Sequence, residues 1–180
     1  MSFEKPEIWV WRHPRPDGAA GRCIGAGTDL PVHWRATKRL ARRIQKLAQR
    51  ERLPKIVYSS PLSRCADVAA WLKAWGWQHH QDPNLLELNF GAWDGRAWAE
   101  VQQTEVDAWV ADFVDHAPGG GESLASLLER AGTWRPQAGR LAISHGGWML
   151  ARRWVKEQGQ VLPSAAAWPK PPGYGKMWRL

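Results

Sequence analysis

The chain has 180 residues, of which 44% are hydrophobic and 23% charged, a balance typical of a globular protein with one well-buried core. Its two cysteines are too few for a disulfide framework, and no His and Cys cluster has the spacing of a zinc site. No apolar run approaches the ~20 residues of a membrane span, and residues 1–7 lack the apolar segment of a signal peptide, so we expect a cytoplasmic protein without a membrane partner.

The formal net charge of +8 is concentrated in one segment. Residues 30–50 contain no acid and seven bases: Arg35, Lys38, Arg39, Arg42, Arg43, Lys46 and Arg50. A solvated helix face explains most of this charge, and an anionic partner or substrate steering remains the alternative. Nucleic-acid binding is not expected, because the bases are not interleaved with aromatic residues as in known nucleic-acid folds.

The first half of the chain predicts strands alternating with helices. Apolar runs predict strands at 8–11 and 55–59, and a stripe of apolar residues predicts an amphipathic helix at 35–50. A Gly- and Pro-rich loop is expected at 14–31. Ser60 is expected to cap the next helix, with Pro61 at its first position.

The second half continues the alternation after an extended stretch at 77–86. Its predicted elements are a helical pattern at 97–115, a flexible Gly-rich turn at 118–121, a helix at 122–131 capped by Glu122 or Ser123, a buried strand at 140–144, a helix at 146–158 ended by Gly159, a loop at 162–175, and a closing edge strand at 176–180.

This order predicts an α/β fold, a three-layer α/β/α sandwich around a mostly parallel sheet. We expect one domain over residues 1–180, with a small helical cap insertion at about 92–121 over the site. Ligands bind beyond the carboxyl ends of strands in such folds. Arg12-His13, Ser59 to Arg64 and Ser144-His145 all follow predicted strands, so we expect them to meet at one rim.

The residues at this rim suit a phosphate monoester. Arg12 and Arg64 would bind the dianion, because a guanidinium presents a fixed fork of N–H donors. His145 would add an imidazole donor, and the helix start at Gly146 and Gly147 would add backbone N–H groups.

His13 is the candidate nucleophile, and Glu87 is the candidate acid. One neutral ring nitrogen of His13 would attack phosphorus, while the other would donate to a fixed acceptor such as a backbone carbonyl. An alkoxide leaving group needs a proton, which Glu87 would supply before it activates the hydrolytic water. No metal or cofactor is needed for this reaction. Each of these residues could instead have a purely structural role. For Glu122, capping of a helix is slightly favoured over a role in the site.

Taken together, these segments resemble the histidine phosphatase superfamily, which is phosphoglycerate mutase-like in fold. The matching motifs are Arg12-His13, Ser60-Pro61-Leu62-Ser63-Arg64, Glu87 to Gly91, Gly121-Glu122-Ser123 and Ser144-His145-Gly146. The resemblance implies a phosphohistidine intermediate on His13, a phosphate pocket of Arg12, Arg64 and His145, and Glu87 as the proton donor.

The segment 21–32 is similar to a stretch of α-ribazole phosphatases, which act in cobalamin biosynthesis. We therefore place Cys23 and Thr28 among the substrate-binding residues, together with Gly146 of the second-histidine motif, with a buried packing role as the alternative for Cys23. Pro14 replaces the glycine of the family signature, so no N–H at that position contacts phosphate. We interpret this departure as a feature of specificity.

The leading hypothesis is a metal-independent phosphomonoesterase acting on α-ribazole 5′-phosphate or a related small phosphate, either as a monomer or as a homodimer. A phosphatase of another phosphorylated metabolite and a phosphoglycerate mutase are the alternatives within enzymes. A non-catalytic module that binds phosphate or nucleic acid is the alternative of another class.

Overall fold

The computed structural model describes residues 7–180 and contains a five-stranded sheet in the order β3-β2-β4-β1-β5. The strands are β1 (Trp9–Arg12), β2 (Ile56–Ser59), β3 (Gln78–Gln81), β4 (Leu141–Ser144) and β5 (Met177–Arg179). The first four are parallel, and β5 runs antiparallel to β1 at the edge. The predicted α/β fold with a mostly parallel sheet and a closing edge strand is confirmed.

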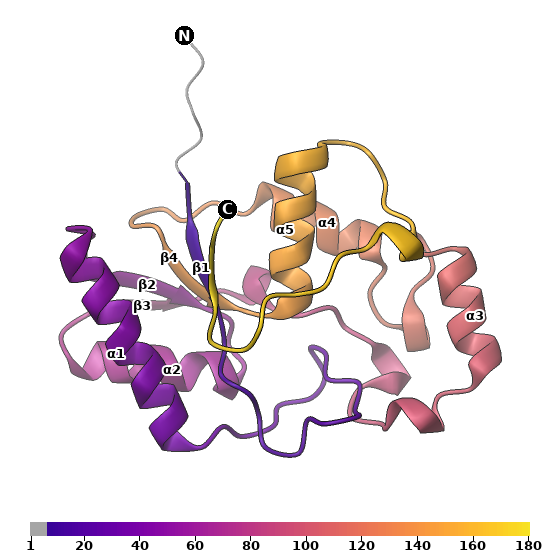
Figure 1. Cartoon of the computed structure of the whole chain (residues 1–180), viewed down its shortest axis with the longest axis horizontal. Coiled ribbons are helices and arrows are strands. Elements are labelled where there is room, and N and C mark those ends of the chain that lie inside the picture. Colours follow the sequence, from indigo (N-terminus) through magenta and orange to yellow (C-terminus); the bar gives the residue numbers. More distant parts are fainter. Residues whose placement is uncertain (1–6) are drawn as a thin grey trace, which may run out of the picture.

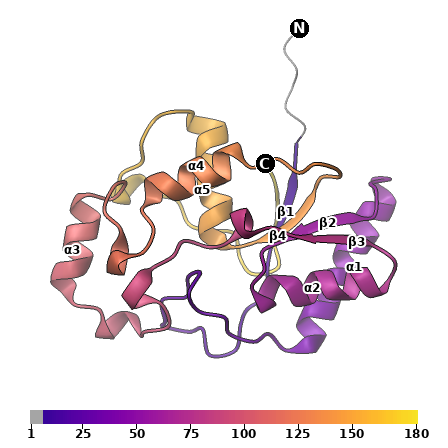
Figure 2. The same cartoon turned by 180° about the vertical axis from the view of Figure 1, so that it is seen from behind.

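Helices cover both faces of the sheet (Figures 1 and 2). One layer consists of α1 (Trp34–Arg50) and α2 (Ser63–Ala74), and the other of α4 (Leu124–Thr133) and α5 (Gly146–Gln158). Successive residues of β1 point to opposite faces. Trp9 and Trp11 therefore pack in the core with Leu40 and Ile44 of α1, whereas Val10 packs in the core under α4 and α5. Burial on both faces explains why β1 is apolar from its start.

Helix α2 begins at Ser63, and the expected capping by Ser60 with Pro61 at the first position is wrong. Asp29 takes the capping role from a distant loop, because its carboxylate accepts from the Ser63 backbone N–H at 2.9 and 3.0 Å and from the Ser63 hydroxyl at 2.8 Å. The Ser60 hydroxyl instead accepts from the N–H of Leu62 at 3.4 Å. Helix α4 is capped by Ser123, so Glu122 is free for another role.

The region between β3 and α4 contains less regular helix than expected. Strand β3 ends at Gln81, and the rest of the predicted extended stretch contains the 3₁₀ turn Pro83–Leu85. The predicted helical pattern at 97–115 contains the 3₁₀ turn Trp98–Glu100 and the helix α3 (Gln103–Ala111), which lies at the end of the molecule opposite α1 (Figure 1). Within residues 7–180, no helix has the length and apolarity to cross a membrane.

Candidate active site

Parallel pairing brings the ends of β1 and β4 side by side. The N–H of His13 donates to the carbonyl of Ser144 at 3.1 Å, which sets the two histidines after these strands next to each other. Their rings meet edge to face with centroids 5.0 Å apart. Arg64, in the first turn of α2, donates to the ring of His145. The predicted convergence of three strand exits at one rim is therefore present.

The His13 ring is held in one tautomer. Nδ1 lies 2.7 Å from the carbonyl oxygen of Pro14, and because a carbonyl can only accept, Nδ1 carries the proton and Nε2 keeps its lone pair. Burial, then the charge of Arg64, lowers the pKa of His13 to about 3, so the ring is neutral near pH 7. Pro14 lacks an N–H but retains the carbonyl that orients His13.

The guanidinium of Arg64 is almost completely buried and has an acceptor at each nitrogen. Nη1 donates to the carbonyl of Thr28 at 2.5 Å, Nη2 to the carbonyl of Gly25 at 3.0 Å, and Nε to Nδ1 of His145 at 3.3 Å. Thr28 thus supports the site through its backbone, while its hydroxyl donates to Asp94 at 3.1 Å.

His145 is fully buried, and both of its ring nitrogens have neighbours. Because Nδ1 accepts from Arg64, Nε2 carries the proton, and it lies 3.6 Å from Sγ of Cys65. The same sulfur lies 3.6 Å from the carbonyl oxygen of Ser144, to which its S–H donates. Burial, then the charge of Arg64, lowers the pKa of His145 well below its usual value. Cys65 is a neighbour of the site that sequence reasoning missed.

Arg12 keeps one edge of its guanidinium unpaired. Nη1 donates to the carbonyl of Pro172 at 2.7 Å, and the guanidinium carbon lies 4.0 Å from the ring centre of Tyr174. Nε is buried and meets no acceptor among the described residues. Gly146 leaves room for this group, because a Cβ at that position would lie 3.1 Å from the Arg12 guanidinium carbon.

The carboxylate of Glu87 lies at the N-terminus of α5. Oε2 accepts from the N–H of Gly147 at 2.9 Å, and Oε1 accepts from the N–H of Trp148 at 3.1 Å. The helix start expected to bind phosphate is thus occupied by the candidate acid. A Cβ at Gly147 would overlap Oε1 of Glu87, so this contact requires glycine.

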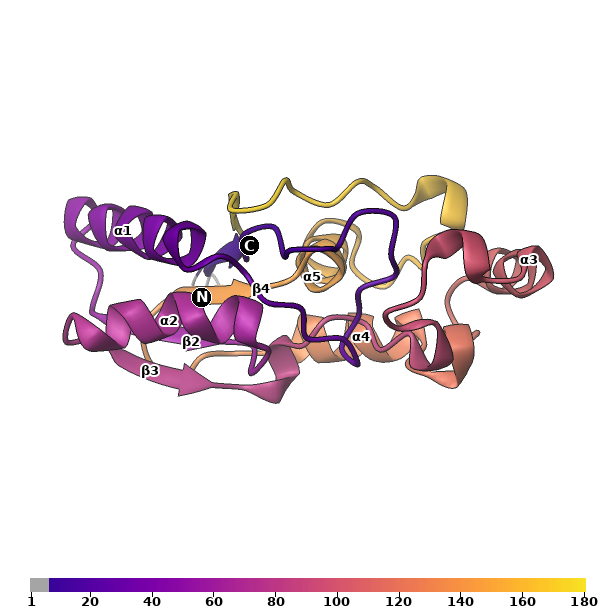
Figure 3. The same ribbon diagram turned by 90° about the horizontal axis from the view of Figure 1, so that it is seen from below.

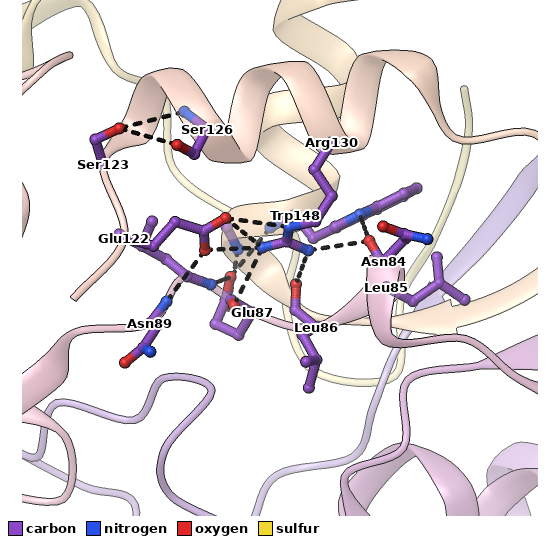
Figure 4. Close-up of polar contacts among 12 residues, drawn as sticks. Asn84, Leu85, Leu86, Glu87, Asn89, Glu122, Ser123, Ser126, Arg130 and Trp148 are labelled. Atoms are coloured by element: carbon purple, nitrogen blue, oxygen red, sulfur yellow. Dashed lines mark hydrogen bonds and ion pairs between the residues drawn. The ribbon is translucent and has the colours of Figure 1, made fainter.

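The loop that bears Glu87 is fastened by Arg130, a residue that the sequence analysis missed. Arg130 donates to the carbonyls of Asn84 and Leu86 at 2.9 and 2.8 Å, and Glu122 accepts from it at 2.8 to 3.1 Å (Figure 4). Oε2 of Glu122 also accepts a hydrogen bond from the backbone N–H of Asn89 at 3.3 Å. The Glu122–Arg130 pair therefore holds the chain on both sides of the acid.

The loop at 21–32 is organised by the carboxylate of Asp94, another residue that the sequence analysis did not assign to the site. Asp94 accepts from the backbone N–H groups of Gly25 at 2.6 Å and Gly27 at 3.1 Å. Cys23 is 0% exposed and packs with Trp93 and Val101, which favours the packing alternative over the expected contact with substrate. Burial also raises the pKa of its thiol.

A cavity of about 310 Å³ opens beside Glu87 and Gly147. Its walls come from the loop after Glu87, the segment 92–121, the helices α4 and α5, and the C-terminal loop. They are apolar and aromatic and comprise Leu88, Phe90, Trp109, Phe113, Leu124, Leu127, Leu150, Ala165, Trp168, Pro169 and Pro171. The expected cap segment thus contributes Trp109 and Phe113. Among residues 7–180 no cluster of three His, Cys, Asp or Glu side chains could hold a metal ion.

A model of the histidine phosphatase superfamily (branch 1) matches residues 8–152. The chain belongs to this superfamily. It is 29% identical to the metal-independent phosphoserine phosphatase of Arabidopsis thaliana over 165 residues, which are 84% of this chain and 68% of that protein. The enzyme is thus a phosphatase of the histidine phosphatase type.

Solved structures share its fold. The α-ribazole phosphatase of Shigella flexneri aligns with a TM-score of 0.73 at 22% identity, over 96% of this chain and 88% of that chain. A mycobacterial glucosyl-3-phosphoglycerate phosphatase aligns with a TM-score of 0.67 at 24% identity, with the same coverage. The predicted superfamily is confirmed, while the substrate of this phosphatase is a separate question.

Proposed function

We propose that the protein is a metal-independent phosphomonoesterase that works through a phosphohistidine on His13. The observation that carries this proposal is the Nδ1 contact of His13 with the Pro14 carbonyl, which leaves Nε2 unprotonated and nucleophilic. The depressed pKa of His13 keeps that lone pair available at neutral pH.

The reaction has two steps. Nε2 of His13 attacks phosphorus, the P–O bond to the alcohol breaks, and Glu87 in its acid form gives its proton to the leaving oxygen. Glu87, now a carboxylate, takes a proton from water, whose oxygen attacks the phosphohistidine and releases inorganic phosphate and free His13. Arg12 and Arg64 are proposed to stabilise the transferring phosphoryl group, while His145, whose Nδ1 accepts from Nε of Arg64, is proposed to position that arginine.

We propose α-ribazole 5′-phosphate as the substrate. The similarity of segment 21–32 to α-ribazole phosphatases supports this, and the aromatic walls of the cavity beside Glu87 suit a flat, uncharged benzimidazole. Phosphoserine, named by the Arabidopsis relative, is the second candidate. Its charged amino acid group suits these apolar walls less well, because burying an unpaired charge is costly.

Phosphate release from a substrate panel tests both the proposed metal-independent phosphatase activity and the proposed substrate. The panel contains α-ribazole 5′-phosphate, phosphoserine, 3-phosphoglycerate and p-nitrophenyl phosphate, each with and without a chelator. We expect release in the presence of chelator, with the highest kcat/KM for α-ribazole 5′-phosphate. A higher kcat/KM for phosphoserine would overturn the substrate assignment, and isomerisation of 3-phosphoglycerate without net phosphate release would point to a mutase.

The covalent step has its own test. After a rapid quench with the best substrate, ³¹P NMR of the denatured enzyme should show a phosphohistidine that survives base and is lost in acid. A burst of trapped phosphate that resists acid would contradict a histidine nucleophile.

A further inference from the structure

The tail segment, residues 168–175, returns from the end of the molecule near α3 to the start of β5 (Figure 3). At the end of this segment, the N–H of Gly175 donates to the carbonyls of Arg12 at 3.1 Å and His13 at 3.2 Å. Gly175 has a φ of +68°, a conformation that glycine adopts without strain. The tail segment is thus attached to the backbone of the two residues that open the site.

Two tail residues hold the guanidinium of Arg12. The carbonyl of Pro172 accepts from Nη1 at 2.7 Å, and the ring of Tyr174 lies under the guanidinium with its centre 4.0 Å from the carbon. The same ring lies 5.5 Å from the ring of His13, measured between centroids. Tyr174 therefore flanks the candidate nucleophile and a candidate phosphate-binding residue together.

The contacts leave the opposite edge of Arg12 free. A guanidinium offers Nε–H and Nη2–H along one edge, and this pair forms the fork that binds two oxygens of an anion. No described residue accepts from Nε, although the atom is buried. Buried N–H groups are nearly always paired, so an unpaired one beside the candidate nucleophile indicates a place for a ligand acceptor.

The chemistry of the two tail contacts also preserves the charge of Arg12. An acidic partner would compete with phosphate for the guanidinium and neutralise it. A peptide carbonyl and an aromatic face are both neutral, and the cation–π contact uses no N–H donor. The tail segment thus restricts the orientation of Arg12 without occupying its fork.

We propose that Tyr174 is a positioning residue that orients Arg12 for phosphate through its ring, with the Pro172 carbonyl as the second support. This inference rests on the proposed function for its catalytic consequence. Its binding consequence can be measured without turnover, because inorganic phosphate and orthovanadate would occupy the same fork.

The test compares Tyr174→Leu with Tyr174→Phe in the full-length chain. Calorimetric titration with orthovanadate should show affinity weakened about five- to tenfold in Tyr174→Leu, the range expected for loss of one cation–π contact on a partly exposed residue. Tyr174→Phe should stay within about twofold of wild type, because it retains the ring. Leu162→Ala, at an exposed position of the C-terminal loop before the tail segment, is the control for general disturbance of the loop.

A double-mutant cycle with Arg12→Ala shows whether Tyr174 affects orthovanadate affinity through Arg12. If Tyr174 acts through Arg12, Tyr174→Leu should change orthovanadate affinity by less than about twofold in the Arg12→Ala background. A full-sized effect in that background would overturn the proposal, since Tyr174 would then act independently of Arg12. Equal weakening by Tyr174→Phe and Tyr174→Leu would overturn it as well, because the hydroxyl and not the ring would be responsible.

The test of the role of Tyr174 can fail or succeed independently of the test of the proposed phosphatase mechanism. Wild-type protein that binds orthovanadate but releases no phosphate from any substrate would refute the phosphatase mechanism while leaving the binding comparison intact. Phosphatase activity with unchanged orthovanadate affinity in Tyr174→Leu would refute only the role of Tyr174.

Discussion

The proposed phosphate side and the proposed leaving-group side of the candidate site are built by different means. On the phosphate side, His13, Arg64 and His145 are each less than 5% exposed and follow strands whose register fixes their positions. On the proposed leaving-group side, Glu87 lies in a loop and its carboxylate is held at the start of α5. The cavity beside it is lined by α4 and α5 and also by the segment 92–121 and the C-terminal loop. The first side is part of the core, whereas the second depends on the loops that cover it.

This difference indicates where chemistry and specificity reside. The buried side chains on the sheet leave little freedom for change, because core substitutions leave cavities or unpaired polar groups. On the other side, the cavity walls that come from the segment 92–121 and the C-terminal loop can change without disturbing the sheet. We therefore expect substitutions on the phosphate side to abolish turnover and those on the leaving-group side to change the choice of substrate.

The largest effect is expected for His13→Ala. Without the proposed nucleophile, kcat should fall by about 10³-fold or more for every substrate in the panel. Orthovanadate affinity should stay within a few-fold of wild type, because the arginines remain. Stopped-assay phosphate release gives the first value and calorimetry the second, with exposed His80→Ala as the matched control. Turnover within tenfold of wild type would show that another residue attacks phosphorus.

Glu87→Gln should have the next largest effect, and one that depends on the leaving group. For α-ribazole 5′-phosphate we expect kcat to fall about 10²- to 10³-fold, as for loss of a general acid. The loss should be smaller for p-nitrophenyl phosphate, since its leaving group departs without a proton. The comparison of the two kcat ratios is the measurement, with exposed Glu129→Gln as control. Equal losses for both substrates would rule out proton donation by Glu87.

Arg130→Met tests the support of the acid loop. Removing the bonds to the Asn84 and Leu86 carbonyls should let Glu87 move, with kcat for alkyl phosphates lowered about tenfold and orthovanadate affinity unchanged. The loss should be smaller for p-nitrophenyl phosphate, which depends less on Glu87. A uniform loss across substrates and orthovanadate would mean that Arg130 supports the fold as a whole.

Trp168→Ala should alter selectivity more than catalysis. Loss of one aromatic wall of the cavity should raise KM for α-ribazole 5′-phosphate about five- to tenfold, by removing apolar contact with the leaving group. KM for the small glycerol 3-phosphate should change little. Trp34→Ala, at a tryptophan of α1 that is 54% exposed, is the matched control. A parallel rise for both substrates would exclude the cavity as a leaving-group site.

The smallest effect is a dependence of stability on pH. His13 has a pKa of about 3 in the folded protein and an ordinary value of 6.5, so between these values the unfolded chain binds more protons than the folded one. Stability should therefore fall as the pH drops below about 6.5. Thermal unfolding of His13→Gln from pH 7 to pH 5 should show a smaller fall in Tm than wild type or exposed His80→Gln. An identical slope in all three would contradict a buried neutral His13.

The sequence predicted the strand ends and the side chains that follow them. Arg12, His13, Arg64 and His145 each lie at the end of an apolar run or in the helix turn after it, and the geometry of parallel sheets brings such positions together. The superfamily motifs placed Glu87 in the same site. These predictions needed only local patterns and one rule about sheets.

The contacts that sequence reasoning missed connect distant parts of the chain. Asp29 caps α2 across 34 residues, and Pro172 binds Arg12 across 160 residues. No local pattern marks Arg130 or Tyr174, because an arginine in a helix and a tyrosine in a Pro-rich loop are equally compatible with solvent exposure. The burial of Cys23 was not predicted, because a motif shows a residue's position in the chain and not the direction of its side chain.

The 160-residue separation between Arg12 and its Pro172 support also matters during synthesis on the ribosome. The strand that carries Arg12 and His13 emerges early, yet both of its partners, β4 and β5, are made much later. Its two tryptophans therefore stay exposed until β4 and β5 have been synthesised. Non-local strand pairing of this kind slows folding and favours aggregation. We expect a nascent chain halted before β4 to require a chaperone and to lack affinity for orthovanadate.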